Sequence, residues 1–470
     1  MQPLQSAVPL IVYIDFKSPY AYLAVEPTRQ MLAQHGLVAD WRPFVLDIQS
    51  YLGSAKLGKS GKVAEQSRSP EQWSGVKYAY FDCRRYANLR RLTVRGTVKI
   101  WNTDLPAIGM FWLKQQASLE EQCRPDSLLN RYIDAIYEPF WKREMDVEQL
   151  DVIEDVLSGI GADVTGFRAY AEGAGQDFNA DFQHAAFEAG VYGVPTYILQ
   201  DTTSGTIQRY FGREHLPRIA WHLTGEQGPA PDIAYESGFD AGRTPPATKS
   251  LTVCVDFKSA GAYLALQPTI KMARDAGIEL QWQIIYTPAL REPTDPGAKP
   301  DRGALHKYIR GRYLVDDLRR YAAHELSDLH DAQRSDFAAA GLLWVNDKQG
   351  DADAYITAVF ARFWRQRENI DSAADDILNH INNNNYSSFV KDEKSFSLFS
   401  AVQYHSKYFD VNSILRHEWH STFEMPLIPT LAIESKISQF FKFRLKYNRN
   451  FRIPTYNDRF WSSVGAIGNI

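Results

Sequence analysis

The hydrophobic pattern near the start of the chain predicts two strands joined by a helix. A continuous apolar run at Leu10–Phe16 predicts a buried strand, and Val38–Leu46 predicts a second one. Between them Ser18–His35 predicts a helix, and Gly36 stands where a C-terminal glycine cap belongs. Parallel strands joined by a helix make a right-handed crossover.

The pattern changes period twice before residue 224. A largely helical region is predicted from about Pro70 to Glu172. Val194–Gln200 and Thr206–Phe211 then predict a hairpin, and a last helix begins near Glu214. The order β-α-β, helical insert, β-β-α is the arrangement of a thioredoxin fold with an inserted helical domain.

The opening pattern returns later in the chain. Val12–Ala24 is repeated as Val253–Ala265, an offset of 241 residues from position 12 to position 253. The stretch Asp82–Ala87 returns as Asp317–Ala322 at a smaller offset. Such self-similarity predicts two related units, the second with shorter loops.

The repeat and the composition divide the chain into four parts. We expect a first unit at 1–224, a glycine- and proline-rich linker at 225–250 and a second, degenerate unit at 251–381. The final 89 residues, 382–470, differ abruptly, with only two glycines and three alanines among many aromatic residues. They are either an out-of-frame end to the reading frame or a diverged genuine domain.

Composition and charge narrow the class of protein. Apolar residues make up 44% of the 470 residues, and the net charge of −4 gives no reason to expect nucleic acid or an anionic membrane as a partner. No apolar stretch approaches a membrane span and Met1–Pro9 does not look like a signal peptide, so a cytoplasmic location is expected. The three cysteines form no C-x-x-C pair and no zinc spacing, so no metal is expected.

Ser18-Pro19 has two interpretations. A serine cap followed by proline in the first turn is what many helices use for structure alone. A strand-to-helix turn also aims backbone N–H groups at one spot, and a hydroxyl there can hydrogen-bond a thiolate and lower its pKa. In the second interpretation Ser18 receives a visiting thiol.

Gly193-Val194-Pro195-Thr196 also has two interpretations. It is either an ordinary loop entering a strand or a cis-proline loop whose Val194 backbone pairs with an extended, peptide-like ligand. Because only about 5–6% of X–Pro bonds in folded proteins are cis, the sequence alone favours the ordinary loop.

These motifs, in this order, resemble those of 2-hydroxychromene-2-carboxylate isomerases and kappa-class glutathione transferases. The resemblance rests on Asp15–Tyr22, Trp41–Phe44, Lys77–Ala87, Phe140-Trp141 and Gly193–Thr196, and spans about residues 10–222. It implies an α/β protein of two tandem thioredoxin-like (DsbA-like) units with helical insertions, the second incomplete or divergent.

The resemblance also implies a site. Ser18 stands where redox relatives carry the attacking cysteine, and Ala21 where they carry the second. Ser18 is implied to hydrogen-bond the sulfur of glutathione, and Tyr20 and Asn102 to lie near the substrate. The residues implied to bind glutathione are Val194, Pro195, Thr196, Gly212, Arg213 and Glu214. The family's Gly-x-Asp-Arg is here Gly212-Arg-Glu-His215, a departure at the γ-glutamyl end.

The function implied is glutathione-dependent isomerisation or conjugation of a small aromatic or electrophilic organic acid. The expected partner is a small-molecule substrate, and a homo-oligomer is left open. A non-catalytic thioredoxin-fold binding module is the alternative, because fold does not imply function. A thiol–disulfide oxidoreductase is a third possibility that the missing C-x-x-C disfavours.

Overall fold

A computed structural model describes most of the chain. The described residues are 1–57, 63–200, 206–234, 249–297, 300–326, 329–330, 334–372, 374, 377, 395–406, 409–420, 427–436 and 442–448. The expected hairpin turn, most of the linker and the four asparagines at 382–385 lie outside them. The chain divides into two compact units, Met1–Leu378 and Asn379–Ile470.

A four-stranded sheet forms the centre of residues 1–224, which we call the first repeat. Its strands are β1 (Leu10–Ile14), β2 (Asp40–Pro43), β5 (Thr196–Gln200) and β6 (Ile207–Phe211), in the order β2-β1-β5-β6. β1 and β2 are parallel, whereas β5 is antiparallel to both β1 and β6. This confirms the predicted crossover and hairpin, and all five residues of β1 are buried.

Helices cover both faces of this sheet. α1 (Pro19–His35) lies on one face, where Thr28 Oγ1 and Tyr197 Oη of β5 are 2.8 Å apart, and it also contacts α10 (Leu216–Leu223). α9 (Ala174–Glu188) lies on the other face, where the ring of Phe182 stacks on that of Tyr13 at 6.3 Å. The core therefore forms as two layers of side chains, one on each face of β1 and β5.

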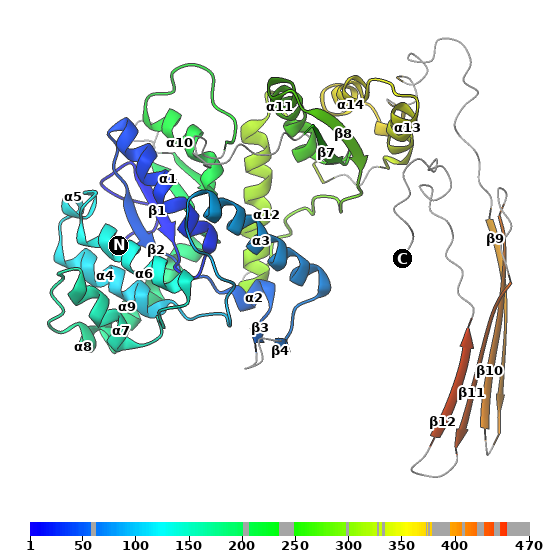
Figure 1. Ribbon diagram of the computed structural model, residues 1–470, viewed down its shortest axis with the longest axis horizontal. Coiled ribbons are helices and arrows are strands. Elements are labelled where there is room, and N and C mark those ends of the chain that lie inside the picture. The colour runs from blue at the N-terminus through cyan, green and yellow to red at the C-terminus, as the bar shows by residue number, and fades with distance from the viewer. Residues whose placement is uncertain are drawn as a thin grey trace. The chain divides into compact units, whose positions relative to one another are not determined.

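The helical insert follows the predicted region closely. Figure 1 shows its helices gathered beside the sheet. The helices of the insert are α3 (Pro70–Leu89), α4 (Asp104–Gln116), α5 (Leu119–Gln122), α6 (Leu128–Lys142), α7 (Leu150–Gly159) and α8 (Phe167–Ala171). Outside it, α2 (Ile48–Leu52), β3 (Ala55–Leu57) and β4 (Val63–Gln66) precede the insert, and the 3-10 turn η1 (Arg213–His215) follows β6.

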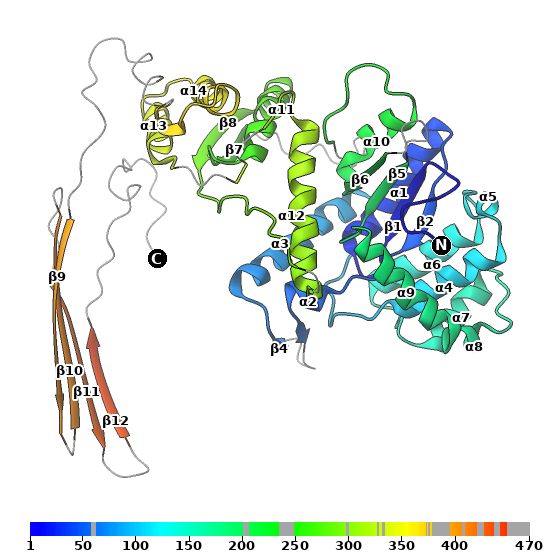
Figure 2. The ribbon, with the colours of Figure 1, turned by 180° about the vertical axis from the view of Figure 1, so that it is seen from behind.

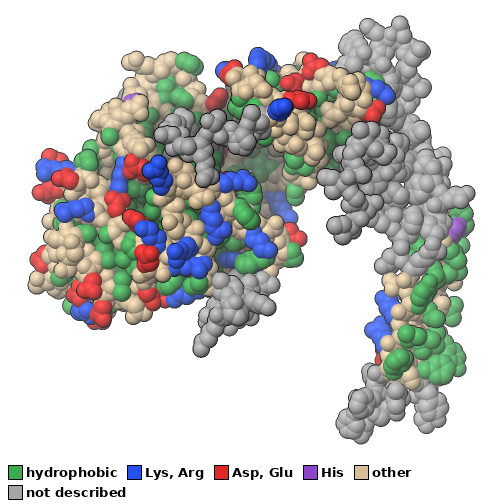
Figure 3. Space-filling view, viewed as in Figure 1, with side chains coloured by type: hydrophobic (Ala, Val, Ile, Leu, Met, Phe, Trp, Pro, Cys, Tyr) green, Lys and Arg blue, Asp and Glu red, His purple; other side chains and the backbone are tan. Residues whose placement is uncertain are grey.

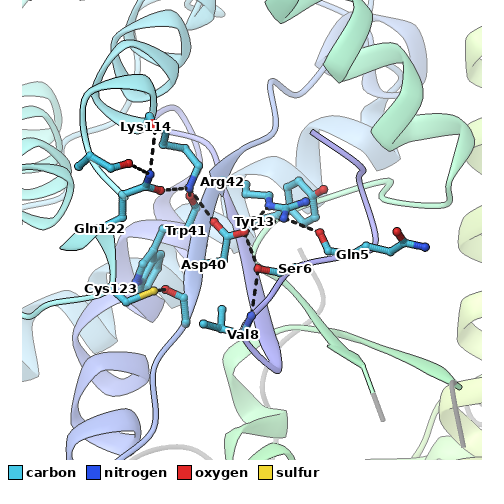
Figure 4. Close-up of polar contacts among 12 residues, drawn as sticks. Gln5, Ser6, Val8, Tyr13, Asp40, Trp41, Arg42, Lys114, Gln122 and Cys123 are labelled. Atoms are coloured by element: carbon cyan, nitrogen blue, oxygen red, sulfur yellow. Dashed lines mark hydrogen bonds and ion pairs between the residues drawn. The ribbon is translucent and has the colours of Figure 1, made fainter. Parts of the chain in front are cut away.

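A buried ion cluster ties the insert to the sheet (Figure 4). The Asp40 carboxylate of β2 accepts from Arg42 Nη2 at 2.6 Å and from Lys114 Nζ of α4 at 2.6 Å, and it also accepts from Ser6 Oγ. The side chains of Asp40, Arg42 and Lys114 are each at most 5% exposed. Burial alone would raise the pKa of Asp40, but the charges of Lys114 and Arg42 outweigh it and hold the pKa below its ordinary value.

The segment 251–381, which we call the second repeat, has the same β-α-β order as the start of the chain. β7 (Ser250–Val255) and β8 (Glu279–Ile284) are parallel and joined by α11 (Ala260–Ala276), as β1 and β2 are by α1. They form a two-stranded sheet. β7 alternates between exposed and partly buried residues and ends at the buried Val255, whereas β1 is wholly buried. The elements that follow are α12 (Arg302–Tyr321), α13 (Asp336–Asp347), α14 (Ala352–Phe360) and the π-helical turn η2 (Ala361–Arg365).

The described part of the C-terminal unit is an antiparallel sheet in the order β12-β11-β10-β9. Its strands are β9 (Ser395–His405), β10 (Phe409–His420), β11 (Ile428–Lys436) and β12 (Lys442–Asn448). Large apolar side chains gather on these strands and are exposed (Figure 3), including Phe399 at 72% and Tyr447 at 60%. Such an arrangement differs from the β-β-α end of the first repeat.

The ion cluster predicts a large loss of stability when its carboxylate is removed. Asp40→Ala leaves two buried cations without their counter-ion, which costs about 3–5 kcal/mol. Asp134→Ala is the matched control, because its ion pair with Arg29 is exposed and such pairs contribute about 0–1 kcal/mol. Hydrogen exchange of the β1 and β2 amides measures both local free energies. Equal losses in the two variants would contradict the role assigned to the cluster.

Candidate functional site

Ser18 begins α1 directly after the first strand, as the sequence predicted. Its backbone is extended, with φ −94° and ψ 114°, and its Oγ accepts a hydrogen bond from Ala21 N–H at 3.2 Å. Pro19 occupies the first turn, where no N–H is needed, and Gly36 closes the helix in the left-handed region. The local sequence therefore fixes where the hydroxyl stands at the positive end of the helix.

The Val194-Pro195 loop meets Ser18, and of the two forms that the sequence left open it has the cis-proline one. The Val194–Pro195 peptide bond is cis, the one such bond among the described residues. Ser18 Oγ donates to the Val194 carbonyl at 3.5 Å. Within the described part of the chain the Val194 N–H donates no hydrogen bond, although Val194 is only 4% exposed. An N–H without a partner in the protein, on the residue whose carbonyl meets the hydroxyl, is a place where a ligand can pair.

Thr196 and Gly193 shape this loop. Thr196 Oγ1 donates to the Gly193 carbonyl at 2.7 Å, so its side chain closes the loop upon itself. A Cβ at Gly193 would meet the ring of Phe211 at 2.7 Å, which explains the glycine. We therefore find Thr196 in a structural contact at the position that the resemblance assigned to ligand binding.

The Gly212–Glu214 turn lies beside the same loop. Gly212 has φ +117° and its N–H donates to the Pro195 carbonyl at 3.0 Å. Arg213 is buried, and its guanidinium stacks on the ring of Tyr86 in α3 at 4.3 Å. Burial raises the pKa of Glu214, with a further increase from Asp317 of α12 that Arg213 partly opposes. The turn is thus joined to its neighbours within the protein on both sides.

Tyr20 and Asn102 have separate surroundings. Tyr20 Oη donates to Asp82 Oδ2 of α3 at 3.1 Å, and burial raises the pKa of Tyr20. Asn102 lines a cavity of about 940 Å³, together with Lys17, the neighbour of Ser18. The Asn102 side-chain carbonyl accepts from Asp104 N–H at 2.7 Å, at the start of α4. The structure therefore brings Asn102, and not Tyr20, to this cavity.

The second repeat also reaches this region, which the sequence did not predict. Arg302, the first residue of α12, lines the same cavity and pairs with Asp47 at 3.2 Å. Further along α12, Tyr313 Oη accepts a hydrogen bond from Phe211 N–H at 2.8 Å. The repeated stretch Asp317–Ala322 was the signal available in the sequence, since it marks α12 as the counterpart of α3.

His215, which stands at the arginine position of the family's Gly-x-Asp-Arg, is also held by α12. Its Nδ1 lies 2.7 Å from Tyr321 Oη, and the residue is 3% exposed. Burial, aided by the nearby charge of Arg320, lowers the pKa of His215 to about 4. A neutral His215 therefore joins the first repeat to the second.

Comparison with known families identifies the first part of the chain. Residues 9–224 match the family model of the DSBA-like thioredoxin domain. This segment is a DsbA-like thioredoxin domain. No curated protein matches the chain.

Solved structures similar to this chain include proteins of two activities. A 2-hydroxychromene-2-carboxylate isomerase is 18% identical with a TM-score of 0.34, covering 46% of this chain and 94% of its own. A probable DsbA oxidoreductase from Streptomyces coelicolor is 18% identical with a TM-score of 0.35, covering 50% and 97%. Cytosolic disulfide reductase DsbM from Pseudomonas aeruginosa, solved with GSH, is 15% identical with a TM-score of 0.30, covering 46% and 98%.

Two further features of the described residues bear on the class of site. They hold no group of three or more His, Cys, Asp or Glu side chains arranged to bind a metal ion. No described helix is both long and apolar enough to cross a membrane.

The cysteines predict an absence of disulfide chemistry in the DsbA-like domain. Ser18 and Ala21 cannot form a disulfide, and burial raises the pKa of Cys83 to about 12, which suppresses its thiolate. We expect no insulin-reductase turnover above background. Turnover that disappears on Cys83→Ala or Cys254→Ala would contradict this.

The pKa of His215 predicts that acid loosens α12. Neutral His215 is favoured in the docked state, whereas an undocked histidine titrates near 6.5. Its contribution is thus present above about pH 6.5 and is lost as the pH falls toward 4. Between pH 7 and pH 5 the loss is roughly 2 kcal/mol.

The measurement is hydrogen exchange of the α12 amides at the two pH values, corrected for the intrinsic exchange rate. His215→Gln carries no titrating ring and should make the pH dependence shallower. Because Asp317 and Arg320 also face His215, the comparison with this variant isolates the histidine. Equal pH dependence in the variant and the unchanged chain would contradict the assignment.

Proposed function

We propose that the DsbA-like domain binds glutathione at Ser18 and the Val194–Pro195 loop. We further propose that it uses the thiol to isomerise or conjugate a small aromatic or electrophilic organic acid. The observation that carries the proposal is the meeting of the Ser18 hydroxyl with the Val194 backbone beside a cis proline, where neither position 18 nor position 21 holds a cysteine. A domain without its own thiol in this place suits a thiol supplied by the ligand.

The backbone of Val194 supports binding of a peptide-like molecule. Its N–H is unpaired among the described residues, and its C=O receives only the long 3.5 Å bond from Ser18. Together they offer one donor and one acceptor to the cysteinyl residue of the ligand, in the manner of an added strand. The site thus suits glutathione at its centre.

Ser18 would then stabilise the sulfur. Its Oγ accepts from Ala21 N–H, so its proton is free to turn from the Val194 carbonyl to a thiolate. The N-terminal N–H groups of α1 add the positive end of the helix dipole. A charge-assisted hydrogen bond of this kind contributes about 1.5–3 kcal/mol.

The cavity beside Lys17 would hold the second substrate. It has room for a small organic molecule, and its lining combines amides such as Asn102 with apolar side chains such as Trp101. Lys17 and Arg302 are cations in this lining, and each would exchange its present partner, Asp15 or Asp47, for the carboxylate of a substrate. The thiolate of bound glutathione would add reversibly to a conjugated carbonyl compound held in this cavity.

A specific observation favours the non-catalytic binding module as the second candidate. Ser18 is 5% exposed and Val194 is 4% exposed while α12 lies against the neighbouring strand β6. If no thiol enters, the domain serves only as a docking surface for the second repeat.

The test of the proposed function is the ultraviolet absorbance of the glutathione thiolate, titrated with pH in the presence of the full chain. Because one pKa unit corresponds to about 1.4 kcal/mol, the pKa of bound glutathione should fall by roughly one to two units. Ser18→Ala should remove this shift and lose about tenfold or more of the thiolate at neutral pH. The substitution also removes a helix cap, which costs about 1 kcal/mol of stability.

The second repeat offers a matched control. Ser259 caps α11 and accepts from Ala262 N–H at 3.2 Å, the same distance as in the Ser18 cap. Ser259→Ala should therefore reproduce the loss of a cap and leave the thiolate titration unchanged. Identical titration curves for the unchanged chain and Ser18→Ala would favour the non-catalytic module.

A further inference from the structure

Helix α12 of the second repeat lies along the open edge of the DsbA-like sheet. β6 is the last strand of that sheet, so one of its edges has no strand partner. There Phe211 N–H donates to Tyr313 Oη at 2.8 Å, and Arg320 Nη2 donates to the Arg209 carbonyl at 2.8 Å. Side chains of α12 thus satisfy backbone groups that an incoming strand would otherwise use.

Tyr313 also packs on both segments that form the cis-proline loop. Its ring lies 5.6 Å from the ring of Tyr192, two residues before Val194, and 6.2 Å from the ring of Phe211. Phe211 immediately precedes Gly212, whose N–H donates to the Pro195 carbonyl. The tyrosine therefore covers the approach to the loop from the β6 side.

The N-terminal part of α12 is anchored to α2. His306 stacks on the ring of Tyr51 in α2, with centroids 3.9 Å apart and planes 3° apart. It also meets Tyr192 edge-on at 5.7 Å. Gly303 lies so close to Ser50 that an added Cβ would come within 2.5 Å of the Ser50 carbonyl oxygen. Figures 1 and 2 both show α2 at the end of α12.

These contacts limit the length of any chain that can pair with Val194. An extended residue covers about 3.3–3.6 Å, so a tripeptide spans roughly 10 Å and a longer peptide must continue past Tyr192 or Phe211. Both of these residues are covered by Tyr313. A small thiol centred on Val194 spans about 10 Å or less and need not extend past either residue.

We propose that α12 is a specificity element that admits small thiols to the Ser18 site and excludes extended polypeptides. It rests on the proposed function for the position of the ligand at Val194. In this arrangement α12 of the second repeat forms part of the boundary of the Ser18 site. The site then accepts small molecules and not polypeptides.

The experiment uses Ser18→Cys in the full chain as a reporter of access. Two probes carry the same leaving group, the mixed disulfide of thionitrobenzoate with glutathione and with the central cysteine of an unstructured ten-residue peptide. The introduced thiolate forms a mixed disulfide with the probe's cysteine sulfur and releases thionitrobenzoate, whose absorbance gives the rate. The chain with Ser18 supplies the background from Cys83, Cys123 and Cys254.

Two changes loosen α12 independently. Tyr313→Ala removes the ring that covers the loop, and Tyr308→Ala is its control, because the contacts of Tyr308 are with Arg312 of its own helix. Gly303→Ala forces α12 away from Ser50. Gly261→Ala is its control, since an added Cβ there meets nothing closer than 3.7 Å.

The measured quantity is the rate with the peptide probe divided by the rate with the glutathione probe. Each loosening change should raise this ratio by at least about tenfold, and neither control should change it. An unchanged ratio in a folded loosened variant would overturn the proposal. Because the ratio needs no glutathione catalysis, a missing thiolate shift in the Ser18 titration with a raised ratio would refute the proposed function alone.

Discussion

The hydrogen bond from Ser18 Oγ to the Val194 carbonyl joins two loops that are 176 residues apart in the chain. It can form because β5 runs antiparallel to β1. The C-terminal end of β1 and the N-terminal end of β5 therefore lie at the same end of the sheet. Gly193 must lack a side chain to fit under Phe211, and Gly212 must adopt a positive φ to reach the Pro195 carbonyl. The helical insert lies between these two loops in the sequence, and the Ser18–Val194 contact forms with the insert present.

Much of this arrangement was predictable because its causes are local. Ser18, Pro19 and Gly36 define the two ends of α1 by capping alone, and the apolar runs define β1 and β5. The cis bond at Pro195 was different, because no local property of Val194-Pro195 distinguishes it from a trans bond. Only the order of the motifs, and the family they resemble, indicated it.

The remainder depended on distant partners. Nothing near Asp40 indicates that Lys114 will reach it from α4, since that pair exists only once the insert has folded onto β2. The resemblance implied that Glu214 binds glutathione and marked His215 only as a departure from the motif. In the structure Glu214 lies near Asp317 and His215 contacts Tyr321. A short motif specifies which side chains stand at a position, but the helix that packs over them determines which partners they contact.

The repeated signature shows how the second repeat has a role without a complete site of its own. Tyr86 of α3 receives the guanidinium of Arg213 at 4.3 Å, and Tyr321, its counterpart in α12, receives that of Arg218 at the same distance. Both helices therefore hold the segment that follows β6, one from each repeat. Among its described residues the second repeat has a sheet of two strands and no cis proline. Tyr321 thus joins α12 to the first repeat by the same kind of contact that Tyr86 of α3 makes within its own domain.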